Sequence, residues 1–294
     1  MDIKWVKTLC FYHRADLDGI CSAAIVNKFV QNVDFYGIDY GDRFPWELIS
    51  KYKRIIMVDW SLEPIDELIE LSEKTNLTCI DHHKSTVERY EANKKKLKGK
   101  YIIKTGKAGC ELAWEYFTSR FSGYDSKMPL AVYFIGRYDV WDIKADKKIL
   151  PFQYGLRAKV NGYDDEIWKE LLSDGAPYDP YLIVEEGNAI LRYNKKSDKM
   201  YCDLYGYEVM FEKHKAFVIN RGGANSTMFE SKFDNGYKLY IAYVKNSNNQ
   251  WRVSLYSTKI DCSKLATRYD GGGHAGAAGF VCDKLPWKQV LKGW

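Results

Sequence analysis

The sequence predicts an α/β protein with two domains: an N-terminal domain with a parallel sheet flanked by helices, and a smaller C-terminal α/β domain. Three observations predict this class. About the first 140 residues alternate short apolar runs with helical patterns, which is typical of a parallel sheet wrapped by helices. The length of 294 residues exceeds the usual size of one compact domain. The last third carries further strand-like runs.

The strands expected in the N-terminal domain each end at or just before a polar residue. The expected strands are residues 6–12, 33–38, 55–58, 77–80 and 101–103, and the helices between them include 20–30, 65–73 and 111–121. Ligands of parallel sheets gather at the carboxyl ends of the strands. We therefore expect the polar side chains that follow these strands to lie together at one edge.

The rest of the chain is expected to change character near residue 195. A mostly helical region over 129–198 ends in a connecting helix over 182–193, and residues 198–202 return to strand character. The domains are therefore expected to be 1–195 and 196–294. The expected C-terminal strands are residues 207–211, 216–219, 239–244, 251–256 and 279–282, with a hairpin turn at 245–250.

The composition favours a folded protein of the cell interior. No apolar run approaches the roughly 20 residues that a membrane-spanning helix needs. The seven cysteines are odd in number and contain no CxxC pair, which favours reduced thiols over disulfides or a zinc ribbon. We therefore expect a cytoplasmic location and no membrane partner.

The excess of positive charge lies in the last third of the chain. Residues 203–294 contain 13 Lys and Arg against 8 Asp and Glu, whereas residues 1–202 contain 31 of each kind. A solvated basic surface explains such an excess, and so does a site for an anionic ligand. Both interpretations stay open at this point.

The first candidate motif combines one imidazole with two carboxylates. His13, Asp16 and Asp18 lie within six residues, at the end of an expected strand and directly before an expected helix. Carboxylates placed so closely are costly unless a cation neutralises them. The alternative is a solvated turn in which Asp18 caps the next helix.

Further acids and histidines follow the next apolar segments. They are Asp59, Asp81, His82, His83 and Asp139. An adjacent Asp and His supply a metal ligand together with the carboxylate that orients it, an arrangement that favours Asp81 and its neighbours as part of a site. Asp142, close to Asp139, is interpreted as a surface or capping acid.

Together these motifs place two or more histidines and about four carboxylates at one edge of the sheet. This mixed nitrogen and oxygen donor set suits Mn²⁺, with Mg²⁺, Co²⁺ or Zn²⁺ as alternatives. The ligands are too many for one ion but suit two. Two ions roughly 3.5–4 Å apart activate a bridging water and clamp phosphoryl oxygens. We therefore expect hydrolysis of a phosphoester or phosphoanhydride.

Glycine-rich segments and arginines in the last third are candidates for substrate binding. The candidates are Gly271, Gly272, Gly273, His274, Arg221 and Arg268. Glycines let backbone N–H groups approach an anion closely, and His274 can contact phosphate directly. Tight turns also need glycine, and a solvated surface also explains the two arginines.

The motifs, in this order, resemble those of the DHH phosphoesterase superfamily. The triplet that names the family is seen here as Asp81, His82 and His83, and the GGGH motif of its DHHA1-type second domain is seen at 271–274. The resemblance spans residues 10 to about 282 and points to oligoribonuclease or nanoRNase-like members. Many of those carry H-x-x-P-D-x-D, whereas this chain has no proline between His13 and Asp16, which indicates a divergent branch.

This resemblance implies a role for each candidate residue. The first metal is implied to be held by His13, Asp16 and Asp59, and the second by Asp18, Asp59, His82 and Asp139. Besides the bridging Asp59, the implied catalytic residues are His83, which faces the substrate phosphate, and Asp81, which supports the histidines. His274 and the adjacent glycines are implied to bind the substrate across a cleft between a DHH domain and a DHHA1-like domain.

Several functions are compatible with such a site. Hydrolysis of short oligonucleotides to nucleoside 5′-monophosphates is the first hypothesis. A phosphodiesterase for a cyclic or linear dinucleotide, or a bisphosphate nucleotidase, is the second. A pyrophosphatase or polyphosphatase and a non-catalytic nucleotide sensor are less favoured. The expected partner is a short oligonucleotide or dinucleotide substrate, and the oligomeric state is left open, with a homodimer as one option.

Overall fold

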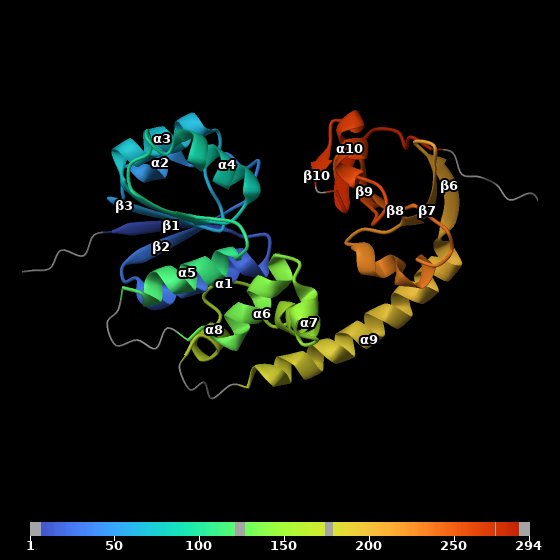
Figure 1. Cartoon of the computed structure of the whole chain (residues 1–294), viewed down its shortest axis with the longest axis horizontal. Helices are drawn as coiled ribbons and strands as arrows, with labels where there is room; N and C mark the ends of the chain where they lie inside the picture. The colour runs from blue at the N-terminus through green and yellow to red at the C-terminus, as the bar shows by residue number, and fades with distance from the viewer. Residues whose placement is uncertain (1–6, 121–126, 174–178, 274, 288–294) are drawn as a thin grey trace, which may run out of the picture. The chain divides into compact units, whose positions relative to one another are not determined.

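A computed structural model describes residues 7–120, 127–173, 179–273 and 275–287 of the chain. The contacts divide the chain into two compact units, Met1–Ile190 (unit 1) and Leu191–Trp294 (unit 2) (Figure 1). Each unit has its own sheet and its own buried cores.

Unit 1 contains a five-stranded parallel sheet in the order β2-β1-β3-β4-β5. Its strands are β1 (Thr8–His13), β2 (Val33–Ile38), β3 (Arg54–Val58), β4 (Asn76–Asp81) and β5 (Lys100–Ile103). The predicted parallel sheet is thereby confirmed. Because all five strands run in one direction, their carboxyl ends lie at a single edge, where a site is expected.

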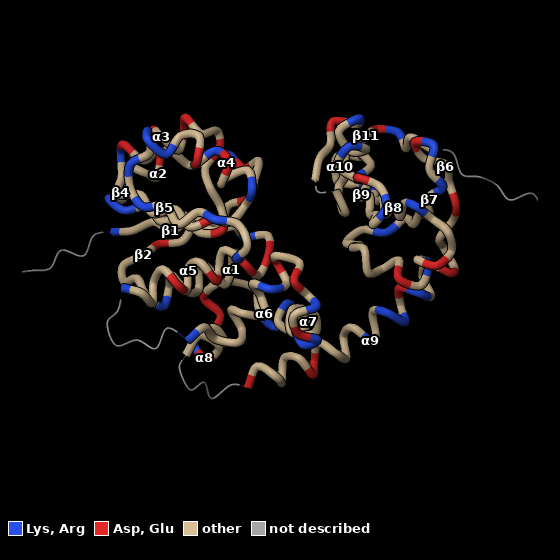
Figure 2. Tube along the Cα trace, viewed as in Figure 1, with Lys and Arg blue, Asp and Glu red and all other residues tan. Residues whose placement is uncertain are grey.

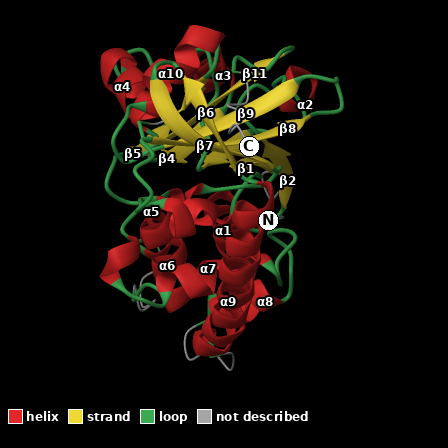
Figure 3. Ribbon diagram, turned by 90° about the vertical axis from the view of Figure 1, so that its right-hand side faces the viewer, coloured by secondary structure: helices red, strands yellow, loops and turns green. Residues whose placement is uncertain are grey.

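Helices cover both faces of this sheet (Figures 1 and 3). One face carries α2 (Trp46–Ile49), α3 (Ile65–Lys74) and α4 (Lys84–Asn93), and the other carries α1 (Leu17–Phe29) and α5 (Gly109–Thr118). Neighbouring residues of β1 enter different cores: Cys10 packs on the α1 and α5 side, whereas Phe11 packs on the α3 side. This alternation is what a strand buried on both faces requires.

The predicted helical region after residue 129 is also confirmed. It contains α6 (Leu130–Asp139), the short η1 (Ile143–Ala145), α7 (Ile149–Arg157), α8 (Ile167–Leu171) and α9 (Pro180–Tyr205), which includes the boundary between the units. Phe134 of α6 and Phe152 of α7 join the core formed by α1 and α5. None of the helices in the described residues is long and apolar enough to cross a membrane.

Residues 198–202 belong to α9, so the prediction of a strand there is wrong. Cys202 is 1% exposed and packs in a core of unit 2, whereas Met200, on the other side of the helix, is 55% exposed. Lys199 and Asp203 form an i,i+4 ion pair of 2.6 Å. Burial of one helix face outweighs the weak strand preference of this short segment.

Unit 2 contains a six-stranded sheet in the order β10-β11-β9-β8-β7-β6, in which only β7 and β8 are parallel. Its strands are β6 (Tyr207–Phe211), β7 (His214–Asn220), β8 (Leu239–Lys245), β9 (Trp251–Tyr256), β10 (Gly272–Gly273) and β11 (Ala277–Cys282). The predicted hairpin is confirmed, with Lys245 opposite Trp251. The helix α10 (Cys262–Ala266) covers one face, and η2 (Ser226–Lys232) contributes to the core on the other.

The positive charges of unit 2 are spread over several elements rather than gathered on one (Figure 2). Several are paired with carboxylates of the same unit, such as Lys232 with Asp203 at 2.6 Å and Lys215 with Glu208 at 3.4 Å. Part of the positive excess of this region therefore belongs to an ordinary solvated surface.

Candidate metal centre

The carboxyl edge of the unit 1 sheet brings the predicted donor residues together. They come from the ends of β1, β3 and β4, from the start of α1 and from the end of α6. We call six of them the donor cluster: His13, Asp16, Asp18, Asp59, His82 and Asp139. These residues lie up to 126 positions apart in the chain, and the parallel sheet makes them neighbours.

The turn between β1 and α1 has a specific geometry. Asp16 is the N-cap of α1, and its Oδ1 accepts hydrogen bonds from the N–H groups of Asp18 (3.0 Å) and Gly19 (3.1 Å). A Cβ at Gly19 would lie 1.9 Å from the carbonyl oxygen of His13, so only glycine fits there. The alternative in which Asp18 caps the helix is therefore wrong, because Asp16 is the cap.

Asp18 is held by the start of another helix. It is 2% exposed, and it accepts hydrogen bonds from the N–H groups of Gly109 (2.8 Å) and Cys110 (2.7 Å) at the N-terminus of α5. Such N–H groups have no partner within their own helix and carry partial positive charge. No motif in the sequence marks these two residues, although the regular order of strands and helices places the start of α5 at this edge.

Asp59 occupies the centre of the donor cluster in a sparsely populated backbone conformation. It is 1% exposed and has a φ of +55°, which is uncommon outside glycine. Its N–H donates to the carbonyl oxygen of Ile80 (2.9 Å). Gly109 packs directly against it, since a Cβ there would lie 2.7 Å from Asp59 Oδ1. The fold thus holds this carboxylate in place from two sides.

The donor cluster divides into two groups with Asp59 between them. In the first, His13 Nδ1 lies 3.4 Å from Asp16 Oδ2 and 3.6 Å from Asp59 Oδ2. In the second, His82 Nε2 lies 3.2 Å from Asp59 Oδ1, 3.2 Å from Asp139 Oδ2 and 3.5 Å from Asp18 Oδ2. The donor atoms of three triplets lie within 4.8 Å of one another, a spacing compatible with shared cations: His13, Asp16 and Asp59; Asp18, His82 and Asp139; and Asp59, His82 and His83.

The electrostatics of the donor cluster call for positive charge. Burial and the charge of Asp59 raise the pKa of Asp18 well above its usual value, and burial and the charge of Asp18 raise the pKa of Asp139 to about 7. Burial lowers the pKa of His13 and of His82, but the neighbouring carboxylates outweigh it and raise both to about 10. In the absence of a cation, protons on the two imidazoles therefore compensate the negative charge of the carboxylates.

Two atoms of the donor cluster lack hydrogen-bond partners within the described part of the chain, which fits metal binding. His13 Nδ1 and Asp59 Oδ1 are buried, and neither has a hydrogen-bond partner among the described residues. Buried polar atoms are normally paired, and an ion is one explanation for those that are not. Imidazole nitrogens and carboxylate oxygens without thiolates suit divalent cations such as Mn²⁺. The residues present therefore fit a metal pair.

Asp81 and His83 form a separate hydrogen-bonded pair beside the donor cluster. Asp81 is fully buried, and its Oδ1 lies 2.7 Å from His83 Nδ1 and accepts from the N–H groups of His82 (2.7 Å) and His83 (3.1 Å). Burial lowers the pKa of His83, but Asp81 raises it by more. The His83 ring lies beside that of His82, with centroids 4.7 Å apart, and its side chain is 33% exposed.

A buried ion pair supports the position of Asp139. Glu111 of α5 is 4% exposed, pairs with Arg137 of α6 and accepts from the N–H of Ala108 (2.9 Å). Arg137 lies two residues before Asp139, so this pair fixes the end of α6 against the start of α5. Neither partner was predicted from the sequence, because nothing local distinguishes them from surface charges.

The predicted substrate-binding residues lie in unit 2. Gly272 and Gly273 form β10, and Gly271 donates its N–H to the carbonyl oxygen of Ala266 (3.0 Å). Arg221 pairs with Asp198 (2.8 Å), and Arg268 pairs with Glu212 (2.7 Å). His274 lies outside the described residues. The role of these residues in substrate binding stays a prediction.

The fold and the site together define an α/β protein with a candidate divalent-metal centre at the carboxyl edge of its first sheet. Residues 7–134 match the model of the DHH family, N-terminal domain. Most of the described part of unit 1 is therefore similar to the N-terminal domain of this family, whose members are phosphoester hydrolases that depend on divalent metals.

Two known proteins are similar to this chain in sequence. It is 24% identical over 316 residues to uncharacterized protein R106 of Acanthamoeba polyphaga mimivirus, a match that covers 95% of this chain and 69% of that protein. It is 36% identical over 45 residues to the bifunctional oligoribonuclease and PAP phosphatase NrnA of Mycoplasma genitalium, which covers 15% of this chain and 14% of NrnA.

A solved structure shares the fold. The pGpG-specific phosphodiesterase PggH from Vibrio cholerae matches with a TM-score of 0.52 and 14% sequence identity, over 94% of this chain and 93% of that one. At this identity the likeness concerns the fold alone.

Proposed function

We propose that this protein is a metal-dependent phosphodiesterase that hydrolyses short oligonucleotides to nucleoside 5′-monophosphates. The observation that carries the proposal is the central position of Asp59. Its Oδ2 faces His13 at 3.6 Å, and its Oδ1 faces His82 at 3.2 Å. A carboxylate shared in this way suits two neighbouring cations. The match of residues 7–134 to the DHH family model and the substrates in the names of NrnA and PggH support a phosphodiester of nucleotides.

Each half of the donor cluster would hold one ion. The first ion is assigned to His13, Asp16 and Asp59, and the second to Asp18, Asp59, His82 and Asp139. Mn²⁺ is the favoured ion, with Mg²⁺, Co²⁺ or Zn²⁺ as alternatives. When bound, such a pair supplies a water of lowered pKa and positive charge beside the phosphoryl oxygens.

His83 is proposed to contact the phosphate that is attacked. Because Asp81 accepts the Nδ1–H of His83, the second nitrogen, Nε2, is left for the substrate. The same carboxylate raises the pKa of His83, which favours the protonated form in which Nε2–H donates to a phosphoryl oxygen. Asp81 itself acts through His83, as a positioning residue.

Unit 2 is proposed to bind the substrate as a DHHA1-like domain of residues 196–294. Its proposed contacts are Gly271, Gly272, Gly273, His274, Arg221 and Arg268. A cytoplasmic location belongs to the same proposal and is supported by the seven cysteines, which form no disulfide.

Release of mononucleotides from defined substrates tests the proposal. With Mn²⁺ the protein is expected to release AMP from pApA and from a five-nucleotide RNA, and EDTA is expected to stop the reaction. Asp59→Ala and His82→Ala should each lower kcat at least about a thousandfold, because each removes a donor to the cations that stabilise the transition state. Asp142→Asn is the matched control, since this half-exposed acid lies outside the donor cluster. Full activity of either donor variant would contradict the proposal.

A second candidate function uses the same residues on other phosphoesters. The likeness to PggH favours a cyclic or linear dinucleotide, and the name of NrnA favours a bisphosphate nucleotidase. Parallel assays with c-di-AMP, adenosine 3′,5′-bisphosphate and pyrophosphate separate these options. Cleavage of c-di-AMP or of the bisphosphate faster than the five-nucleotide RNA would favour the second candidate. Cleavage of pyrophosphate alone would overturn both.

A further inference from the structure

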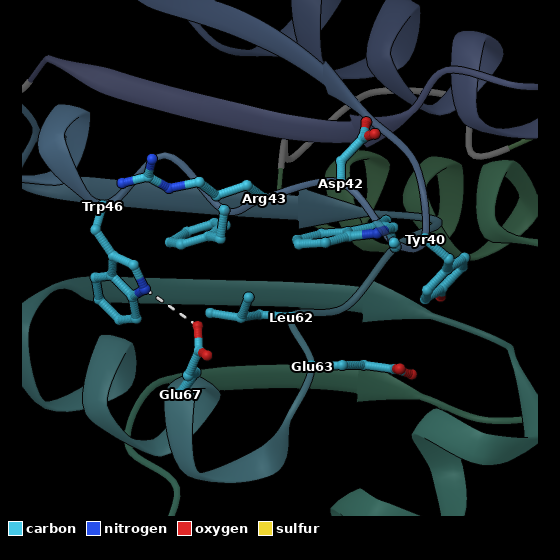
Figure 4. A pocket seen from close by; sticks show the side chains of 10 residues that line it. Tyr40, Asp42, Arg43, Trp46, Leu62, Glu63 and Glu67 are labelled. Carbon is cyan, nitrogen blue, oxygen red and sulfur yellow. Dashed lines mark hydrogen bonds between the residues drawn. The ribbon is translucent and has the colours of Figure 1, made fainter. Parts of the chain in front are cut away.

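A pocket lies in unit 1 beside the donor cluster. It is lined by the loops that follow β2 and β3, the strands on either side of β1, which ends at His13. Tyr40 belongs to both places. Its ring lies 5.7 Å from that of His13 and 5.4 Å from that of His83, measured between centroids, and it also lines the pocket (Figure 4). A ligand that fills this pocket would therefore reach the donor cluster.

The walls of the pocket are aromatic and firmly packed. The cavity has a volume of about 350 Å³, within the range of small-molecule sites. Phe44 and Trp60 are buried, and their rings are nearly parallel at an interplanar angle of 11°. Trp46 packs edge-on against Phe44, with centroids 5.1 Å apart. Such walls suit a flat, apolar ring such as a nucleobase.

Three carboxylates with free oxygens also line the pocket. Asp42 Oδ2 accepts from Arg14, Glu63 Oε1 pairs with Arg89 (2.6 Å), and Glu67 Oε2 accepts from Trp46 Nε1 (3.1 Å). The second oxygen of each has no hydrogen-bond donor among the described residues. Figure 4 places Glu63 toward the Tyr40 end of the pocket and Glu67 beside Trp46.

This combination of groups selects the chemistry of the ligand. The free carboxylate oxygens are acceptors, as phosphate oxygens are, so the part of a nucleotide that they can bind is the base with its N–H donors. Ionised carboxylates only accept hydrogen bonds, so they favour a base edge rich in donors. Guanine presents two adjacent donors, N1–H and N2–H, to a single carboxylate. Arg43 lines the same pocket and offers donors for guanine O6 and N7.

We propose that this pocket binds the guanine base of a nucleotide whose phosphate lies at the donor cluster. Glu63 determines the preference for guanine, and Glu67 contributes to it. The inference rests on the proposed nucleotide phosphodiesterase function, and it adds the identity of the base and the side chains that recognise it.

Competing dinucleotides test the preference during catalysis. The ratio of kcat/KM for pGpG over pApA is expected to be at least about tenfold, the effect of hydrogen bonds to a charged group. The value for pIpI should lie between them, because inosine keeps N1–H and lacks the N2 amino group. Glu63→Gln should reduce the ratio below about threefold. The control Glu70→Gln, an exposed residue of α3 paired with Lys74, should leave it unchanged.

Binding of nucleosides tests the pocket without catalysis. In EDTA, ligand-observed NMR should show guanosine binding more tightly than inosine, and inosine more tightly than adenosine. Glu63→Gln should remove this order. Nucleosides carry no phosphate, so this result does not depend on metal or on hydrolysis. If no dinucleotide is cleaved, the proposed function is wrong. The order of nucleoside affinities would still show whether the pocket binds guanine. Equal affinities, or an order unchanged in Glu63→Gln, would overturn the inference.

Discussion

The donor cluster of unit 1 and the glycine-rich segment of unit 2 differ in how their polar groups are satisfied. Asp18 and Asp59 are almost completely buried, and their charges face other carboxylates. In unit 2, Gly272 and Gly273 are exposed, and Arg268 is already paired with a carboxylate of its own unit. Burial of like charges is costly unless a cation compensates, whereas exposed ion pairs cost and contribute little.

This difference indicates which of the two regions carries the structural signs of a reactive site. Unit 1 keeps a strained, buried and electrostatically unfavourable arrangement, which a fold retains when function needs it. The described residues of unit 2 include no buried carboxylate, so its role depends on what it contacts. Matched substitutions in the two regions are therefore expected to differ in effect.

Among substitutions that leave every residue of the donor cluster in place, the largest effect is expected from a glycine substitution beside Asp59. In Gly109→Ala the new Cβ would lie 2.7 Å from Asp59 Cβ and Oδ1, so the central carboxylate must shift. A shift of this kind should lower kcat/KM with Mn²⁺ at least about a hundredfold. Steady-state kinetics and circular dichroism measure activity and folding. Wild-type activity in a folded Gly109→Ala protein would show that the site tolerates displacement of Asp59.

Gly272→Ala is the counterpart in unit 2. A Cβ at this position meets nothing within 4 Å, so the free energy of unfolding should change by no more than about 0.5 kcal/mol. A raised KM with unchanged stability would support substrate binding by this segment. An unchanged KM would remove Gly272 from the proposed contacts.

An intermediate effect is expected from the charge of Asp139 in the metal-free protein. The pKa of Asp139 is raised to about 7 in the folded state, from an ordinary value of 3.8. The contribution of its bound proton to stability is therefore fully present below about pH 4 and is lost as the pH rises through 7. In EDTA, the Tm of Asp139→Asn relative to wild type should rise between pH 4 and 8. Asp142→Asn should show no such trend, and a flat difference for Asp139→Asn would refute the raised pKa.

The smallest effect is expected from Arg268→Gln. This side chain is 60% exposed and pairs with Glu212, so the free energy of unfolding should change by less than about 0.5 kcal/mol. If Arg268 contacts the substrate, KM should rise several-fold while kcat stays the same, because only binding is weakened. Chemical denaturation and initial rates measure the two quantities. No change in KM would assign Arg268 to the ordinary surface.

The order of strands and helices in unit 1 was readable because it depends on local patterns. Apolar runs of the right length predicted the five strands, and the polar residues after β1, β3 and β4 predicted the edge where the donors meet. The error at residues 198–202 has the opposite origin. The helical state there depends on burial of Cys202 against residues of unit 2, which no local pattern contains.

The sequence by itself thus determined the sheet, its polar edge and the candidate donor residues that lie there, because strand periodicity and residue chemistry are local properties. Only the tertiary structure decided how the donors are held. The N–H groups of Gly109 and Cys110 reach Asp18 across 91 and 92 residues, and Asp59 adopts its φ of +55° with Gly109 packed against it. The pocket next to Tyr40 likewise joins two loops that meet only because β2 and β3 flank β1. Such contacts depend on chain segments brought together by folding, which local sequence does not encode.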